Sequence, residues 1–247
     1  MSYLKKFYHS NNLTIVATGS VDHNQLHNLC EMYFEPIHAG KTPLTKKAEY
    51  KPSQIRESRD IEQAHIIYAF EGCSYNDDDL YVAHLFSNIL GGGMSSRLFQ
   101  NIIENRGLAY SVFSFSSSYK DTGIFGIYSA TSPDKVNEYS EAVANEILNS
   151  EKSITDQEID KAKKQLKAGL LMSSESPVAR MNQIARQISI YDRVIDISET
   201  LERVDSIKKE HITNFVSETF KSKKLTISAL GAISKLSDQD AIQKFYC

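Results

Sequence analysis

The stretch Ala109-Tyr-Ser-Val-Phe-Ser-Phe-Ser-Ser-Ser-Tyr119 alternates apolar and small polar residues, and Asp121-Thr-Gly123 separates it from a second apolar run, Ile124–Ala130. Two such runs on either side of a short turn that contains Gly predict an antiparallel β-hairpin. Because helix-forming sequence lies on both sides of this hairpin, the pattern indicates an α+β fold with a mixed or antiparallel sheet.

The sequence before the hairpin predicts a strand and two helices. The apolar run His65–Phe70 has the length and composition of a strand. Acidic residues at 77–79 suit the start of a helix that reaches about Leu90, because carboxylates stabilise the positive end of the helix dipole. Three glycines follow, and the next helix ends at Gly107.

The sequence after the hairpin predicts further helices and a last strand. Pro133 can occupy the first turn of a helix. The spacing Thr155-x-x-Glu158 is typical of a capping box, and Ser176-Pro177 interrupts the helical sequence that follows. The last strand is predicted at Leu225–Leu230.

An internal repeat links the two ends of the chain. The stretch Ser10-Asn-Asn-Leu-Thr-Ile-Val-Ala-Thr-Gly-Ser-Val21 resembles Ser222-Lys-Lys-Leu-Thr-Ile-Ser-Ala-Leu-Gly-Ala-Ile233, with the first copy starting at 10 and the second at 222, an offset of 212 residues. That offset is the size of a domain rather than of a solenoid repeat. We therefore expect a strand at Leu13–Gly19 that is equivalent to the last strand.

The repeat predicts that the chain starts inside a tandem duplication. Residues 1–36 would be the last strand and helix of a preceding domain of the same fold, with Asp22 capping the helix that ends near Phe34. Residues 37–61, rich in Lys, Glu, Ser and Pro, would be a linker, and 62–247 a complete second domain. The alternative is a single domain with two similar strands.

Composition indicates which kinds of partner and which cellular compartment are expected. Apolar residues make up 41% of the 247 residues, enough for a sizeable core. The net charge is −3, and Lys and Arg are spread along the chain. This charge pattern predicts neither a nucleic-acid partner nor binding to an anionic membrane. No apolar run approaches the roughly 18 residues of a membrane span, and residues 1–12 do not resemble a signal peptide. The odd number of cysteines, Cys30, Cys73 and Cys247, predicts unpaired thiols. Unpaired thiols predict a reducing compartment.

Other candidate motifs favour structural roles. His23 and His27 share one helix face, a spacing that can hold zinc, but the position before His27 is Leu26 instead of an activating carboxylate, so we predict no metal here. The residues Gly91–Arg97 lack the pattern of a phosphate-binding loop and predict a structural turn or a backbone stretch near a peptide. Sequence alone does not show the electropositive surroundings that a reactive Cys73 requires.

Two blocks resemble one protein family. The stretch Leu90-Gly-Gly-Gly-Met-Ser-Ser-Arg-Leu-Phe-Gln100, followed by Glu104-Asn-Arg-Gly-Leu-Ala-Tyr-Ser-Val112, is similar to the second domain of pitrilysin/insulinase-type zinc peptidases, in the branch that contains the mitochondrial processing peptidase. The resemblance continues through 114–131 and also covers the beginning of the chain. With the unpaired cysteines, it implies a location in the bacterial cytoplasm, with the periplasm and the mitochondrial matrix as alternatives. It implies a metallohydrolase-type domain, with helices packed on one face of the sheet, that faces a similar domain across a substrate chamber.

The resemblance also implies that the two domains have different roles. The preceding domain would hold zinc through its own motif, so this chain would carry no catalytic residue, no metal and no cofactor. In the family the second domain contributes a Tyr and an Arg that engage peptide. Tyr110 matches that Tyr, but Ile103 stands at the Arg position, and Arg106 lies one turn later.

Three functions follow as hypotheses. The first is the C-terminal, substrate-binding and chamber-closing half of a zinc metalloendopeptidase, inactive by itself. Its partners would be a peptide or protein substrate and the missing half or a catalytic subunit, with a homodimer as a further option. The second is a catalytically inactive scaffolding subunit of a peptidase-like complex, which Ile103 favours. The third is a separate globular binding domain.

Overall fold

The structure is a computed structural model that describes residues 2–41 and 46–246. Cys247 and part of the predicted linker therefore lie outside the described residues. Contacts divide the chain into two compact units, residues 1–47 with 168–199, and residues 48–167 with 200–247. Each unit is described by itself.

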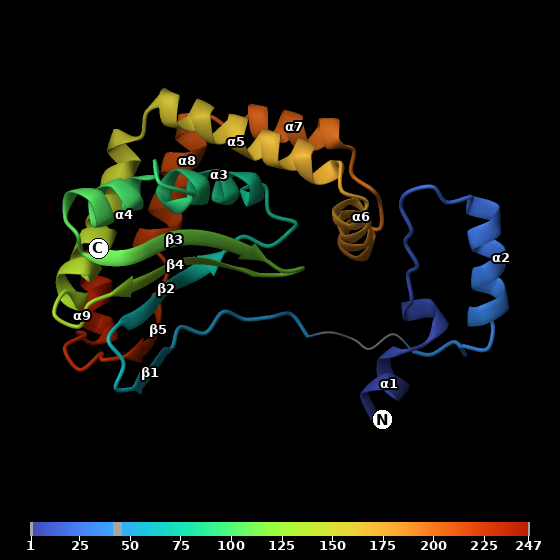
Figure 1. Ribbon diagram of the computed structural model, residues 1–247, viewed down its shortest axis with the longest axis horizontal. Helices are drawn as coiled ribbons and strands as arrows, with labels where there is room; N and C mark the ends of the chain where they lie inside the picture. Colours follow the sequence, from blue (N-terminus) through green and yellow to red (C-terminus); the bar gives the residue numbers. More distant parts are fainter. Residues whose placement is uncertain (1, 42–45, 247) are drawn as a thin grey trace. The chain divides into compact units, whose positions relative to one another are not determined.

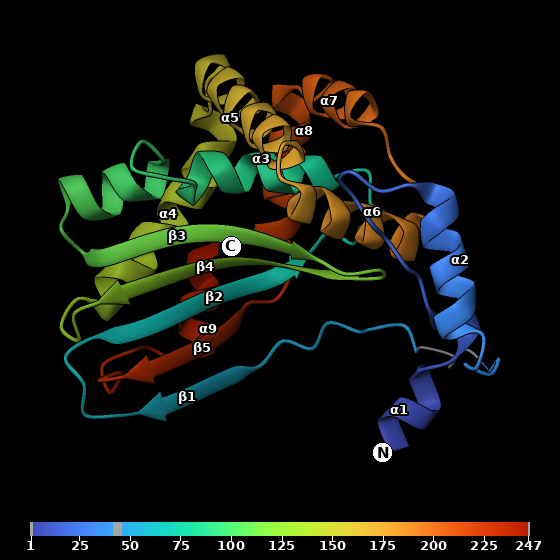
Figure 2. The ribbon, with the colours of Figure 1, turned by 45° about the vertical axis from the view of Figure 1, so that its right-hand side comes forward.

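The larger unit is built on a five-stranded mixed sheet. Its strands are β1 (Gln54–Ser58), β2 (Ala64–Gly72), β3 (Ala109–Ser118), β4 (Gly123–Thr131) and β5 (Thr226–Gly231). Figure 2 shows them in the order β1-β5-β2-β4-β3, so that β1 and β3 form the two edges. All neighbouring pairs are antiparallel except β1 and β5, which run parallel.

Helices complete the larger unit (Figure 1). Those that connect the strands or follow the hairpin are α3 (Leu80–Gly91), the π-helical segment η2 (Phe99–Asn105), α4 (Val136–Ser153), α5 (Asp156–Ser174), α7 (Ile197–Asp205), α8 (Lys209–Val216), η3 (Ser217–Lys221), α9 (Gln239–Gln243) and η4 (Lys244–Tyr246). Helices α5 and α7 each extend across the boundary between the two units.

The core lies between the helices and one face of the sheet. Alternate residues of the central strands, such as Phe70 and Phe125, are fully buried and contact rings from the helices. Phe86 of α3 and Phe215 of α8 lie with ring centroids 5.8 Å from Phe125, and Phe220 of η3 lies 4.9 Å from Phe70. These contacts confirm the predicted α+β fold with helices packed on one face.

The opposite face of the sheet, called the open face below, carries the other set of alternating side chains. Register places one row of residues across all five strands, formed by Ile55, Ser228, Ile67, Tyr128 and Phe113. Ile55 and Phe113, at the two edges, are 65% and 45% exposed. The open face therefore presents apolar side chains to its surroundings.

Most of the predicted helix and turn signals are confirmed. The Asp22 side chain accepts a hydrogen bond from Gln25 N at the start of α2 (His23–Phe34). Thr155 and Glu158 form the capping box, with Thr155 N donating to Glu158 Oε2 at 2.9 Å and Glu158 N donating to Thr155 Oγ1 at 3.3 Å. Ser176 caps α6 (Pro177–Tyr191).

The smaller unit corrects one prediction. It contains α1 (Ser2–Phe7), η1 (Ser10–Asn12), α2 and α6, but the predicted strand at Leu13–Gly19 is not formed, and residues 13–18 have no regular structure. β-Branched sequence favours extended backbone, but a strand also needs a neighbouring strand to complete its ladder hydrogen bonds. Within the part of the chain that the structure describes, this segment has no such neighbour; Thr18 Oγ1 instead donates to Pro177 O at 2.6 Å.

A second correction concerns the predicted linker. Residues 54–58 within it form β1, which adds a parallel edge strand to β5. The strand was missed because its sequence, Gln-Ile-Arg-Glu-Ser, is largely polar, as suits an edge strand with most side chains in solvent. The segment before it is also fixed, because Ala48 N donates to Asp121 Oδ2 at 2.6 Å.

Close packing of α3 on β3 depends on a glycine. A Cβ atom added to Gly91 would lie 2.3 Å from the backbone nitrogen of Ser114, and Ser114 Oγ donates to Ser87 O at 2.7 Å. We expect Gly91→Ala to lower the free energy of unfolding by about 1–3 kcal/mol, because backbone must move to admit the methyl group.

Gly169 provides the matched control for this substitution. It lies inside α5 with nothing within 4 Å of an added Cβ. Gly169→Ala is therefore expected to raise stability by about 0.5–1 kcal/mol. Urea unfolding of both variants checks the pair; equal effects would contradict the close approach of α3 and β3.

Candidate functional site

The candidate site lies where η2 leads into β3. The helix preceding the hairpin begins after the glycine turn and continues as the π-helical segment η2. Gly107 ends it in the left-handed conformation with φ +56°, and its N–H donates to Ile103 O at 3.0 Å. π-Helical turns are often found at functional sites. This short connection positions Ile103, Arg106 and Tyr110 relative to the sheet.

Tyr110 is an extra residue in the hairpin ladder. Ala109 pairs with Thr131 and Ser111 with Ala130, so Tyr110 forms a β-bulge between them. Bulges redirect a side chain and are common next to active sites. The Tyr110 side chain is 66% exposed, which leaves its hydroxyl accessible to a ligand.

Arg106 is directed towards α4. Its Nη2 donates to Glu138 Oε1 at 3.1 Å, and the two side chains are 39% and 56% exposed. Lys135 Nζ donates to the carbonyl of the neighbouring Gly107 at 2.8 Å. An exposed pair of this kind contributes only about 0–1 kcal/mol, so the guanidinium can exchange Glu138 for another acceptor at little cost.

Ile103, at the position of the family's Arg, is partly buried and packs against the hydrophobic core. Its carbonyl accepts hydrogen bonds from the N–H groups of Arg106 and Gly107. The side chain here contributes packing and offers no hydrogen-bond donor to a peptide.

The structure reverses the faces of β3 that alternation and residue size predict. Alternation along β3 puts Phe113 and Phe115 on one side, and their size predicts that side in the core. In the structure Val112 and Ser114 are the buried residues that face the helices, and Phe113 is 45% exposed. The reason is the close approach of α3, which leaves room for a small side chain at Ser114 and none for Phe. The bulge at Tyr110 also breaks the alternation from which the faces were counted.

The histidine pair does not fit a zinc ion. His23 and His27 lie on α2 with ring centroids 6.4 Å apart, and His27 Nδ1 is 3.7 Å from Glu31 Oε2. Among residues 2–41 and 46–246, no group of three or more His, Cys, Asp or Glu side chains is arranged to hold a metal ion. A structural or catalytic zinc site needs at least three protein ligands.

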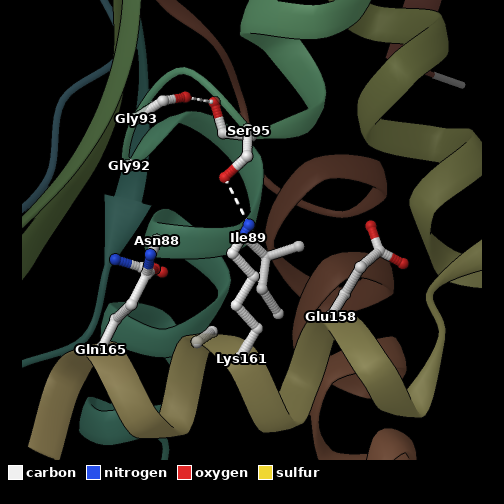
Figure 3. Close-up of a pocket in the computed structure, with 10 residues that line it drawn as sticks. Asn88, Ile89, Gly92, Gly93, Ser95, Glu158, Lys161 and Gln165 are labelled. Carbon is white, nitrogen blue, oxygen red and sulfur yellow. Dashed lines mark hydrogen bonds between the residues drawn. The ribbon is translucent and has the colours of Figure 1, made fainter.

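The glycine turn borders a polar pocket (Figure 3). Gly92, Gly93 and Ser95 form one side, and Glu158, Lys161 and Gln165 of α5 form the other. Lys161 Nζ donates to Ser95 Oγ at 2.6 Å, so the ammonium already has a partner. The Glu158 carboxylate on the wall repels phosphate, so the geometry fits a structural turn better than a phosphate cradle.

Arg97, the last residue of the stretch Gly91–Arg97, forms buried ion pairs that the sequence did not predict. Its Nε and Nη2 donate to the two carboxylate oxygens of Glu158 at 2.7 and 2.9 Å, and its Nη1 lies 3.4 Å from Glu146 Oε1. Nη1 and Nη2 also donate to Ser153 Oγ and O. The Arg97 side chain is 13% exposed. It ties the glycine turn to α4 and α5.

The pKa of Glu158 reflects this environment. Burial alone would raise the carboxyl pKa, but hydrogen bonds from Arg97 and Thr155 outweigh that effect, and the net pKa is lowered. Glu158 therefore remains ionised and keeps its pair with Arg97 near neutral pH.

Cys73 is not an activated thiol. It is buried after β2, and burial, reinforced by the nearby Asp77 and Asp79, raises its pKa to about 12. A nucleophilic cysteine needs a lowered pKa and some exposure. Cys73 is thus a small core residue.

Together the fold and the site define a peptidase-like α+β domain without a metal centre among its described residues. The "Peptidase M16 inactive domain" profile matches residues 1–166, and the chain belongs to this metallopeptidase family. The predicted family is confirmed. Residues 1–166 thus match the family's non-catalytic domain.

Individual relatives support this family assignment. An "uncharacterized zinc protease" of Rickettsia felis is 34% identical over 93% of this chain and 56% of its own length. The mitochondrial-processing peptidase subunit beta of Saccharomyces cerevisiae is 29% identical over 98% of this chain and 56% of its own length. The chain thus spans about half the length of these relatives.

A solved structure has the same fold. A chain of Complex III2 from Candida albicans, bound to Inz-5, superposes with a TM-score of 0.89 at 25% identity, covering 99% of this chain and 61% of that one. No helix among the described residues is long and apolar enough to cross a membrane.

Proposed function

We propose that this chain is the substrate-binding half of a zinc metalloendopeptidase and closes a chamber opposite a zinc-binding domain of the same fold. The observation that carries the proposal is its match to the non-catalytic domain of a family whose relatives include named zinc proteases. The lack of a suitable ligand cluster in the described residues supports placing the zinc in another domain. The proposed substrate is a peptide or protein in extended form.

Tyr110 and Arg106 are the proposed peptide-binding residues. Tyr110 lies in a bulge and is 66% exposed, so its hydroxyl can donate to a substrate carbonyl. Arg106 keeps only an exposed ion pair with Glu138, which a substrate carboxylate or carbonyl can replace.

The smaller unit supports the proposed domain division. Met32 and Tyr33 of α2 are 68% and 67% exposed, and α2 has no fully buried residue. An amphipathic helix is stable mainly through packing of its apolar face. We infer that residues 1–36 complete a preceding domain, and that the second domain starts before β1 and not at residue 62. A cytoplasmic location remains a prediction.

Mixing two halves tests this function. The full chain is combined with the part of the Rickettsia felis relative that it does not span, and hydrolysis of an unstructured fluorogenic peptide is followed with zinc and with chelator. Chelator-sensitive hydrolysis is expected from the mixture and none from this chain alone, because no zinc ligand set is described in it. Equal rates from the mixture and from the catalytic half alone would contradict the role.

A second candidate function is an inactive scaffolding subunit. Ile103 at the family's Arg position favours it, as does the likeness to a chain of Complex III2. If this function is correct, the mixture forms a stable complex by size-exclusion chromatography but hydrolyses no peptide.

A further inference from the structure

The connection between η2 and β3 is held by a later segment of the chain, which runs from the end of β4 into the start of α4. Residues 106–108 form this connection. Thr131 Oγ1 donates to Leu108 O at 2.5 Å, and Lys135 Nζ donates to Gly107 O at 2.8 Å. Two consecutive carbonyl groups just before β3 are thus bound by side chains of one neighbouring segment.

Thr131 is a fully buried polar residue at the end of β4. Alternation along β4 places it on the same side as Phe125, which the helices cover. A buried hydroxyl requires a hydrogen-bond partner, and here the partner is the carbonyl of Leu108, a residue that is itself only 2% exposed. A buried carbonyl that loses its donor carries the cost of desolvation, so this bond favours one position of Leu108.

The bond lies next to the β-bulge. Thr131 pairs in register with Ala109, the residue just before Tyr110. Leu108 N also donates to Ile102 O at 2.8 Å, so both backbone polar groups of Leu108 are bound. A slip of β3 by one residue would move its following side chains to the opposite face of the sheet. The fixed position of Leu108 opposes this slip and leaves Tyr110 as the residue outside the ladder.

Lys135 supports the same turn from the start of α4. It is the residue that precedes α4, and its own backbone is held because Lys135 N donates to Ser132 O at 3.0 Å. The carbonyl that its ammonium group binds belongs to Gly107, the residue with left-handed backbone. A charged donor strengthens a hydrogen bond, but this one is exposed to solvent, so we expect it to contribute less than the buried bond of Thr131.

We propose that Thr131, assisted by Lys135, is a positioning residue for Tyr110. Thr131 is fully buried and does not touch substrate; by holding Leu108 it keeps the Tyr110 hydroxyl where a peptide can reach it. This inference rests on the proposed function, because it concerns the geometry of the proposed peptide-binding residue. Sequence spacing did not indicate the two donors, which lie 23 and 28 residues after the carbonyls that they bind.

Hydrogen exchange tests the positioning on the full chain alone. Thr131→Val keeps the shape of the side chain and removes the donor. We expect the amides of residues 108–112 to exchange at least about tenfold faster in this variant, because the start of β3 opens locally more often. Thr131→Ser keeps the hydroxyl and should exchange at close to the parent's rate. If Thr131→Val does not fold, Lys135→Met, which removes an exposed donor, replaces it with an expected increase of about two- to fivefold.

Ser140→Ala is the matched control. Ser140 is also fully buried, and its hydroxyl donates to Val136 O at 2.6 Å and bonds to the Tyr68 hydroxyl at 2.5 Å, so its partners lie on α4 and β2. Its removal should lower the midpoint of thermal unfolding, as Thr131→Val does, but leave exchange at residues 108–112 unchanged. The control separates a general loss of stability from a local effect on the bulge.

A double-mutant cycle relates the position of Tyr110 to hydrolysis by the mixed halves. Thr131→Val should lower the rate about tenfold when Tyr110 is present. It should have no further effect in Tyr110→Phe, because that variant has no hydroxyl to position. Thr131→Ser should hydrolyse the peptide at close to the parent's rate.

Three results would overturn the proposal. They are unchanged exchange at residues 108–112 in a folded Thr131→Val variant, equally fast exchange in Ser140→Ala, or independent effects of Thr131→Val and Tyr110→Phe on hydrolysis. The exchange measurement needs neither zinc nor a second half. It therefore decides whether Thr131 fixes the bulge even if the mixed halves hydrolyse no peptide, and failure of this inference is distinguishable from failure of the proposed function.

Discussion

Replacing Arg97 by Met is expected to lower the free energy of unfolding by about 3–5 kcal/mol, the usual cost of removing one partner from a buried ion pair. The variant leaves Glu146 and Glu158 close together without their shared cation, and these side chains are only 14% and 32% exposed. It also removes the donors to Ser153, so the glycine turn loses its connection to α4 and α5. Urea unfolding at neutral pH measures the change.

Two comparisons show whether burial of the charges causes this loss. Arg59 pairs with Glu57 at 2.6 Å, but both side chains are about 60% exposed, so Arg59→Met should cost at most about 1 kcal/mol. The Arg97→Met deficit should also shrink towards about pH 4. In the parent chain, the stability that ionised Glu158 contributes is lost as pH falls through the lowered pKa of this carboxyl. In the variant, Glu158 has no Arg97 partner, so its burial favours the protonated form. Equal losses for both Met variants would assign Arg97 an ordinary surface role.

Local sequence patterns predicted the elements that local interactions determine. The hairpin and the caps at Asp22, Thr155 and Ser176 depend on residues close in the chain, and the structure contains all of them. Strands that depend on distant partners were less predictable. The apolar segment from Leu13 forms no strand, and the polar β1 is a strand because β5 lies beside it.

The candidate site was also only partly predictable from local sequence. The resemblance located Tyr110, but its exposure depends on a bulge, which only pairing with β4 defines. Arg97 stands in the quoted motif, yet its partners are 49 and 61 residues further along, on helices that sequence spacing does not bring together. The faces of β3 were predicted wrongly because two Phe residues on a strand favour a core prediction, whereas α3 takes the space on that side.

Tyr110→Phe is expected to lower the rate of peptide hydrolysis by the mixed halves on the order of 100-fold, the usual effect of losing one hydrogen-bond donor to a developing charge. The hydroxyl is accessible at the bulge, so its removal changes chemistry without changing packing. Ile103→Arg should act in the opposite direction, because it restores a cation at the family's position one turn before Arg106. Steady-state hydrolysis of a fluorogenic peptide by each mixture measures both effects.

Tyr119→Phe provides the control, since Tyr119 lies beyond the other end of β3 and is 55% exposed. It should leave the rate unchanged, and Tyr110→Phe and Tyr119→Phe should unfold at the parent's denaturant midpoint. Ile103→Arg should unfold at a lower midpoint, because Ile103 packs against the core. A lower kcat with unchanged KM in Tyr110→Phe would place the hydroxyl in the transition state rather than in ground-state binding. Unchanged hydrolysis in Tyr110→Phe, together with no gain in Ile103→Arg, would mean that this corner is structural. Loss of the complex itself would instead support the scaffolding function, because the same surface would then bind a subunit and not a peptide.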